Sequence, residues 1–242
     1  MPMLPVAVLC GGKGTRIAHL AGELPKALIA VAGEPFLAHQ LRWLRDEGAT
    51  EVVLLTGYGA DAIRAFAGDG TAFHLTIRYS EDGGTPRGTA GAVKRALPLL
   101  GDAFLTLYGD SLPSANLNLN AVAERLTAPY EGVMTVFRND DRWLPSNVTI
   151  DGERVRAYDK QAAPGTMTHI DYGMNAFFAE AFAAVPTDRP VDLAAIHRAM
   201  IERGTLRGFP VRDRWHEVGS PEGLAETERF LRARSTKGSR TA

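Results

Sequence analysis

The order of apolar and polar residues predicts alternating strands and helices over the first 137 positions. Short apolar runs closed by turn residues, which are typical of buried strands, occur at 5–10, 51–56, 103–108 and 132–137. The segment 73–80 alternates apolar and polar side chains, as a strand with one covered face does. Helical spacing of apolar residues lies between these runs, at 35–48, 59–68, 89–100 and 119–126. This succession predicts a parallel sheet with helices on both faces and ligands at the carboxyl ends of its strands.

The second part of the chain has a different pattern. Strands are expected at 147–150, 154–160 and 169–178 with little helix between them, and helices at 191–204 and 221–234. We predict one α/β domain over 1–233, a Rossmann-like three-layer sandwich with a mostly parallel central sheet and a small mixed-sheet extension. Its two halves would meet near position 137, and a disordered polar tail would cover 234–242.

Charge and composition narrow the class of partner. The 242 residues include 27 basic and 28 acidic side chains, a formal net charge of −1, so a nucleic-acid partner is not favoured. No uncharged apolar run reaches the roughly 18–20 residues that span a bilayer, and no signal-peptide pattern begins the chain. We therefore expect a cytoplasmic protein without a membrane partner. The one cysteine, Cys10, is expected to be a buried small hydrophobe, and the scattered histidines predict no zinc site.

A glycine-rich turn, "GGKGTR", follows the first predicted strand at 11–16. A redox-dinucleotide loop needs a third glycine where Ile17 stands, and an acid at the end of the second strand, where Thr56 stands. A Walker loop needs its lysine after the second glycine and before Ser or Thr, and here the order differs. Neither fingerprint is met, so the loop is a different kind of phosphate cradle or a plain turn.

The side chains near this loop suit a polyphosphate. Glycines at 11, 12 and 14 would let backbone N–H groups approach phosphate oxygens. Arg16 offers a planar fork for two oxygens, and Lys26, held after Pro25, offers a point charge. Solvated cations beside a strand-to-helix turn would give the same spacing, so the spacing alone leaves both readings open.

Further segments extend the pattern along the chain. They are "PKAL" (25–28), "VAGEP" (31–35), "RGTAGAV" (87–93), "LYGDS" (107–111), "YDK" (158–160) and "WHEVGSPEGL" (215–224). Together with "GGKGTR", these segments resemble, in order, the motifs of the sugar-1-phosphate nucleotidyltransferases. The resemblance covers about Val6 to Leu231. It implies the nucleotide-diphospho-sugar transferase type of fold, with an NTP half at about 1–137 and a sugar-phosphate half at about 138–233.

The resemblance implies a nucleotidyl transfer from an NTP to a sugar 1-phosphate with Mg²⁺ as cofactor. Because several negative charges meet in such a transition state, catalysis rests on positioning and charge neutralisation. The resemblance assigns the catalytic roles to Arg16 and Lys26. The implied nucleotide-binding residues are Leu9, Gly11, Gly12, Gly14, Thr15, Arg16, Glu81, Gly88, Thr89 and Asp110.

The metal and sugar sites follow from the later motifs. Asp110, directly after a buried strand, and Glu217 are the implied metal ligands. Glu217 is a departure, because the family usually has Asp there. The implied sugar-phosphate residues are Asn147, Lys160, Asp171 and Gly173. The roles of Arg87, which replaces the usual Leu, and of His216 stay open.

Overall likeness is greatest to the branch that transfers GMP to D-glycero-D-manno-heptose 1-phosphate, although no residue forces guanine. Uridylyl, cytidylyl or thymidylyl transfer remains an alternative. A non-catalytic nucleotide-binding subunit and a redox enzyme are the alternatives from other classes. If the chain associates, a symmetric homo-oligomer is the expected form.

Overall fold

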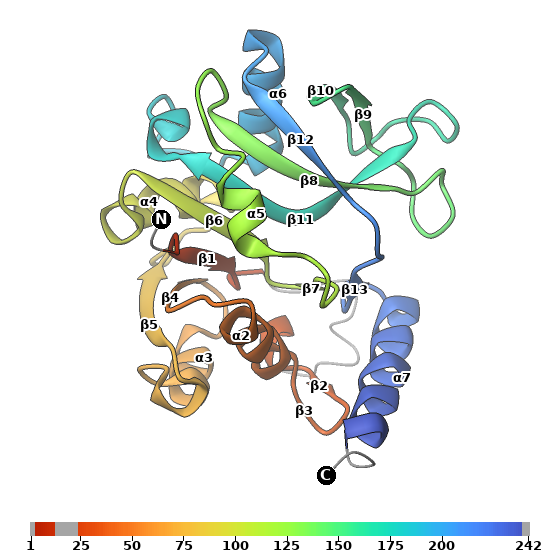
Figure 1. The fold of residues 1–242 in the computed structure, drawn as a ribbon. Coiled ribbons are helices and arrows are strands. Elements are labelled where there is room, and N and C mark those ends of the chain that lie inside the picture. The colour runs from red at the N-terminus through yellow and green to blue at the C-terminus, as the bar shows by residue number, and fades with distance from the viewer. Residues whose placement is uncertain (1–2, 13–23, 239–242) are drawn as a thin grey trace.

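The computed structural model describes residues 3–12 and 24–238, and its centre is one nine-stranded sheet (Figure 1). Across the sheet the strands are β5 (Thr76–Glu81), β4 (Glu51–Thr56), β1 (Val6–Leu9), β6 (Ala103–Tyr108), β11 (His169–Phe178), β8 (Gly132–Arg138), β12 (Leu206–Val211), β10 (Arg154–Tyr158) and β9 (Val148–Asp151). Two short pairs lie beside it, β2 (Ala30–Val31) with β3 (Glu34–Pro35), and β7 (Ser111–Leu112) with β13 (His216–Glu217).

Helices cover both faces of this sheet, as the α/β pattern predicted. They are α2 (Phe36–Asp46), α3 (Ala60–Ala67), α4 (Gly88–Leu100), α5 (Leu119–Ala123), α6 (Leu193–Arg203) and α7 (Pro221–Gly238). One buried cluster joins the sheet to the apolar faces of α2 and α5, and a second joins it to α4 and α6. The three-layer α/β architecture is therefore confirmed.

The first part of the sheet is parallel and has a switch point at β1. Strand β1 pairs with β4 on one side and with β6 on the other, and all three run in the same direction. Leu9 is in register with Tyr108, so the ends of β1 and β6 lie side by side. In open α/β sheets the crevice outside such carboxyl ends is where ligands bind.

The rest of the sheet differs from the prediction. Strand β11 enters antiparallel between β6 and β8, so the sheet is parallel only from β5 to β6 and between β8 and β12. The expected mixed-sheet extension is thus continuous with the central sheet. Local patterning gives each strand its apolar face but does not select its partner, which is why this insertion was not predicted.

Strand β12 was missed altogether. Its sequence "LRGFPV" contains Gly208 and Pro210, residues that argue against a central strand. The sheet tolerates Pro210 because β10 pairs with β12 only at Arg207, so no neighbour needs the missing N–H on that side. All six residues of β12 align with β8 on the other side.

Three element boundaries also need correction. The strand expected at 73–80 begins only at Thr76, because Thr71–Phe73 form a 3₁₀ turn and His74 has φ +55°. Helix α5 ends at Ala123 rather than near Leu126. Helix α7 continues to Gly238, so residues 234–238 are helical and do not begin the expected tail. The polar residues after Arg234 do not break a helix, and Gly238 is the first that favours an end.

Cys10 has the surroundings that the sequence predicted. Cys10 is buried, and its burial raises the pKa of the thiol to about 12, as suits an inert small hydrophobe. Within the described ranges, no helix combines the length and the apolar composition needed to cross a bilayer.

Candidate active site

A cavity of about 1050 Å³ lies at the carboxyl ends of β1 and β6. It brings together residues from both halves of the chain. The predicted residues that line it are Leu9, Gly11, Gly12, Lys26, Gly88, Thr89, Asp110, Asn147, Lys160, Asp171 and Glu217. Gly14, Thr15 and Arg16 lie outside the described residues, so their roles stay predictions.

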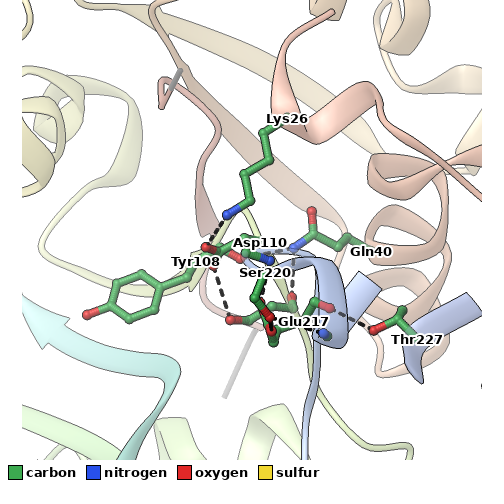
Figure 2. Close-up of polar contacts among 10 residues, drawn as sticks. Lys26, Gln40, Tyr108, Asp110, Glu217, Ser220 and Thr227 are labelled. Carbon is green, nitrogen blue, oxygen red and sulfur yellow. Dashed lines mark hydrogen bonds and ion pairs between the residues drawn. The ribbon is translucent and has the colours of Figure 1, made fainter. Parts of the chain in front are cut away.

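Lys26 and Asp110 form an ion pair in this cavity (Figure 2). Lys26 Nζ lies 2.7 Å from Asp110 Oδ2, and the lysine side chain is only 13% exposed. Lys26 opens a 3₁₀ turn, Lys26–Leu28, behind the extended Pro25. A largely buried cation and a carboxylate therefore meet at the end of β6, where the lysine can offset phosphate charge directly and the carboxylate can hold a divalent cation.

The turn that carries Asp110 is held from two sides. Gln40 of α2 is fully buried, and its Nε2 donates to the carbonyls of Tyr108 (3.0 Å) and Ser111 (2.7 Å). On the other side Val218 N donates to the Asp110 carbonyl at 3.0 Å, beside the β7–β13 pair. One side chain and one strand pair thus fix the backbone around the carboxylate (Figure 2).

Replacing Gln40 with leucine is expected to lower both stability and kcat. It removes the donor from two inward carbonyls, which costs about 1–3 kcal/mol of unfolding free energy. The Asp110 turn then loses its support, so kcat should fall more than KM rises. Urea unfolding and steady-state kinetics measure the two effects, with exposed Gln161→Leu as the matched control. Equal behaviour of the two variants would remove Gln40 from this role.

Glu217 faces the same point from β13. Ser220 Oγ donates to Glu217 Oε1 at 2.5 Å, and Gly219 N donates to Oε2. Thr227 of α7 donates to the Glu217 carbonyl at 2.8 Å. Each carboxylate oxygen thus has one protein donor, which fixes its direction and leaves lone pairs for a further partner.

Gly219 shows how closely these groups meet. A Cβ on Gly219 would lie 2.7 Å from Glu217 Oε2, 3.1 Å from Lys26 Nζ and 3.3 Å from Asp110 Oδ2. Two carboxylates and one ammonium therefore surround a single backbone position, which only glycine can occupy without displacing them. The backbone at Gly219 is part of the site, although the motif analysis assigned Gly219 no role.

The side of the cavity predicted to bind the sugar phosphate contains a carboxylate with tyrosine partners. Asp171 Oδ2 accepts from Tyr108 Oη at 2.8 Å and from Tyr158 Oη at 3.3 Å, and Oδ1 accepts from Gly173 N. Burial, and then the Asp171 charge, raise the pKa of both phenols, so both stay protonated and donate. Asn147 Oδ1 accepts from Asp171 N at 2.9 Å.

Lys160 lies at the edge of this region. Its Nζ is 2.9 Å from Asp192 Oδ1, and both side chains are about half exposed. The same Asp192 oxygen caps α6 by accepting from Ala194 N. Thr89 Oγ1 accepts from Leu193 N at 2.7 Å, so the start of α6 is tied to the start of α4.

Two predicted site residues lie away from the cavity wall. Glu81 is not among its lining residues and forms an ion pair with Arg64 of α3. Gly173 is not among them either; it sits in β11 with φ +89°, and a Cβ there would lie 2.9 Å from Tyr108 Cδ2. Its structural reason for being glycine is therefore the close approach of a tyrosine ring.

Gly88 lines the cavity but also has a packing reason to be glycine. Its φ is +70°, and a Cβ would lie 2.5 Å from the Val191 carbonyl oxygen. Arg87 donates to the carbonyls of Asp82 (3.0 Å) and Thr187 (3.2 Å), so it bridges two loops. His216 stacks on Phe230 with ring centroids 3.6 Å apart, which gives it a structural contact.

Sequence reasoning missed several lining residues. Tyr108, Tyr158 and Asp82 line the cavity, and burial raises the pKa of the Asp82 carboxyl. Tyr108 and Tyr158 stood inside segments that were singled out for their neighbours, Asp110 and Lys160. The period of two along a strand could have shown that Tyr108 and Asp110 lie on the same side of it.

Comparison with known proteins defines the family. Residues 6–157 match the MobA-like NTP transferase domain. The chain belongs to this family. The resemblance found in the motifs is therefore confirmed, and the curated relatives of this MobA-like NTP transferase are sugar-1-phosphate nucleotidyltransferases.

Two relatives and one solved structure illustrate the likeness. The MobA-like chain is 29% identical over 219 residues to a mannose-1-phosphate guanylyltransferase of Mycobacterium tuberculosis, covering 89% of this chain and 61% of that protein. It is 27% identical to the N-acetylmuramate alpha-1-phosphate uridylyltransferase of Neisseria meningitidis, covering 91% of this chain and 95% of that protein. HddC from Yersinia pseudotuberculosis, solved with GMP-PN, shares the fold with a TM-score of 0.80 and 22% identity, over 95% of this chain and 100% of that one.

Proposed function

We propose that the protein transfers a nucleoside monophosphate from an NTP to a sugar 1-phosphate and releases pyrophosphate. GTP with a neutral hexose or heptose 1-phosphate is the leading pair. The observation that carries the proposal is the meeting of Lys26, Asp110 and Glu217 at the carboxyl ends of the strands, in a cavity that continues to Asp171 and Lys160. Use of an NTP supports the cytoplasmic location expected from the sequence.

The chemistry requires a phosphate oxygen of the sugar 1-phosphate to attack the α-phosphorus of the NTP. The bond from that phosphorus to the bridging oxygen of the β-phosphate breaks, and pyrophosphate leaves. Lys26 would stabilise the charge that gathers at the α-phosphate, and Arg16 would bind the leaving pyrophosphate. Lys160 would bind the phosphate of the incoming sugar, and Asn147 and Asp171 would orient its hydroxyls.

The carboxylates fit a magnesium ion. Asp110 and Glu217 present oxygens to one place, and Mg²⁺ in proteins commonly takes one or two carboxylates, with substrate phosphates and water completing its shell. The described residues contain no group of three or more His, Cys, Asp or Glu side chains able to share one metal ion, so a dedicated all-protein cage is absent from that part of the chain. When bound, Mg²⁺ would neutralise phosphate charge.

The charges of the cavity support a neutral sugar. Among its described lining residues the only cations are Lys26 and Lys160, and each is already paired with a carboxylate. Asp82 and Asp171 add further negative charge. A sugar that carries a carboxylate, such as N-acetylmuramate, would place another negative charge here without a free cation among the described lining residues, which is unfavourable in a partly buried site.

A pyrophosphate-release assay with Mg²⁺ tests both parts of the proposal. GTP, UTP, CTP, dTTP and ATP are each combined with mannose, glucose and heptose 1-phosphates and with N-acetylmuramate 1-phosphate. We expect turnover with a neutral sugar, and kcat/KM at least roughly tenfold lower with the carboxylated sugar. Turnover with N-acetylmuramate 1-phosphate alone would overturn the choice of sugar. The proposed reaction would be overturned if no NTP were turned over and NAD raised the melting temperature of the protein in a parallel thermal-shift measurement.

A further inference from the structure

A second hollow of about 450 Å³ lies at the carboxyl ends of the other parallel strand pair, β8 and β12. Phe137 and Val211 are in register at these ends and form its apolar floor. Arg138 is the last residue of β8, and Arg212 follows β12 directly. The full lining is Phe137, Arg138, Asp140, Arg142, Val211 and Arg212. We call it the arginine groove.

The charges of the arginine groove do not balance. Arg138 Nε lies 3.1 Å from Asp140 Oδ2. Among the described residues, this is the one ion pair between two residues that line the groove. In the same part of the chain, the guanidinium groups of Arg142 and Arg212 form no ion pair or hydrogen bond. Two exposed cations thus face a groove whose only carboxylate already has a partner. Two unpaired cations that line one groove favour an anion there.

The nearby acids are directed elsewhere. The Asp141 carboxylate accepts from the backbone N–H groups of Ser146 (2.5 Å) and Gly165 (2.7 Å). Asp213 accepts from Asn116 Nδ2 at 2.5 Å. Neither acid lines the groove, so neither neutralises its free arginines.

The loop that supplies Asp140 and Arg142 is held in a fixed shape. Asp140 and Asp141 both have positive φ, 46° and 56°. Buried Asn139 donates from Nδ2 to the Leu144 carbonyl at 2.6 Å and to Ser146 Oγ at 3.0 Å. Beyond the groove the same loop lines the active-site cavity through Leu144 and Pro145. This loop therefore contributes residues both to the arginine groove and to the active-site cavity.

We propose that the arginine groove binds a phosphate group of a small phosphorylated ligand, separately from the active-site cavity. Guanidinium groups bind phosphate through paired, charge-assisted hydrogen bonds. Two unpaired guanidinium groups match the two negative charges of a phosphate dianion better than the single charge of a carboxylate. The volume of the groove suits a phosphate or a small phosphoester. Phosphate reaches it as the inorganic ion or as part of a sugar phosphate, and the shared chemistry is the dianionic phosphoryl group.

Trp143 offers a direct probe of the groove. It is 40% exposed, and its ring lies 5.5 Å from that of Phe137, which lines the groove. The other tryptophans, Trp43 and Trp215, are buried. Because Trp215 lines the active-site cavity, the Trp143→Phe protein supplies the background to subtract. The readout needs no catalysis, so it is independent of the proposed function.

The test is a fluorescence titration of the full chain with sodium phosphate, mannose 1-phosphate and sodium acetate at constant ionic strength. We expect saturable binding of both phosphates, weak binding of acetate, and a Kd for phosphate that rises roughly tenfold or more in Arg142→Ala/Arg212→Ala. Arg156→Ala, whose arginine is paired with Asp151 on the surface, is the matched control and should bind as the unmodified protein does. Lys26→Ala should also leave this signal unchanged.

Particular outcomes would overturn the proposal. They are an unchanged Kd in the double variant, equal binding of acetate and phosphate, or loss of the signal in Lys26→Ala. Inorganic phosphate binding as tightly as mannose 1-phosphate would assign recognition to the phosphoryl group alone. The Arg142→Lys/Arg212→Lys protein keeps both charges and should bind with intermediate affinity; circular dichroism checks that every variant is folded.

Discussion

Replacing Asp110 with asparagine is expected to lower kcat by about a thousandfold or more, because the change removes a charge that the reaction depends on. The carboxylate pairs with Lys26 at 2.7 Å and faces the place where Glu217 also points. Asparagine has nearly the same shape but neither holds a divalent cation as well nor balances the lysine. The loss should appear in kcat at saturating NTP and sugar 1-phosphate.

The fold should tolerate this change. The Lys26–Asp110 pair is partly exposed, with the Asp110 side chain at 33%, and such pairs contribute about 0–1 kcal/mol to stability. For a chain of this size that corresponds to a change in Tm of about 2–4 °C at most. Asp102→Asn is the matched control, because Asp102 precedes the same strand at its opposite end. Full activity of Asp110→Asn with Mg²⁺ would refute the assigned role.

Replacing Lys26 with alanine is expected to lower kcat/KM by about 10²–10³, or about 3–4 kcal/mol of transition-state stabilisation, the size expected for one preorganised donor. The lysine is 13% exposed and reaches Asp110, in the proposed active site, from the turn behind Pro25. Steady-state kinetics with the best NTP and sugar pair measures the effect.

Lys94→Ala provides the comparison for Lys26. Lys94 of α4 donates to the carbonyl of Ala183 and lies outside the cavity lining. Its replacement should leave kcat/KM within about twofold, as is usual for surface changes of less than 0.5 kcal/mol. If Lys26→Ala matched Lys94→Ala, Lys26 would have no part in the reaction.

The parts of the site that follow single strands were predictable from the sequence. Leu9 ends a buried strand, Gly11 and Asp110 lie within two residues of the ends of such strands, and parallel strands bring their carboxyl ends to one edge. The later motifs added Lys160 and Glu217, which the structure places in the same cavity. For these residues local pattern and overall fold agree.

Long-range pairing was not predictable. No local signal places β11 between β6 and β8, yet that insertion brings Asp171 to the hydroxyls of Tyr108 and Tyr158. Gly208 and Pro210 hid β12, and with it the strand ends that form the arginine groove. Glu81 follows the pattern of a strand end but pairs with Arg64 on the surface. Side-chain partners of this kind depend on neighbours that are distant in sequence.

Phosphorus NMR of a single reaction mixture tests the central claim most directly. The protein is incubated with GTP, mannose 1-phosphate and Mg²⁺, and both products are followed with time. The account predicts that signals of a nucleoside diphosphate sugar and of pyrophosphate grow in equal amounts, and that neither grows with Asp110→Asn. Release of inorganic phosphate without a diphosphate sugar would contradict it. So would the absence of product both in this mixture and in the same measurement on every other NTP and sugar 1-phosphate of the assay panel.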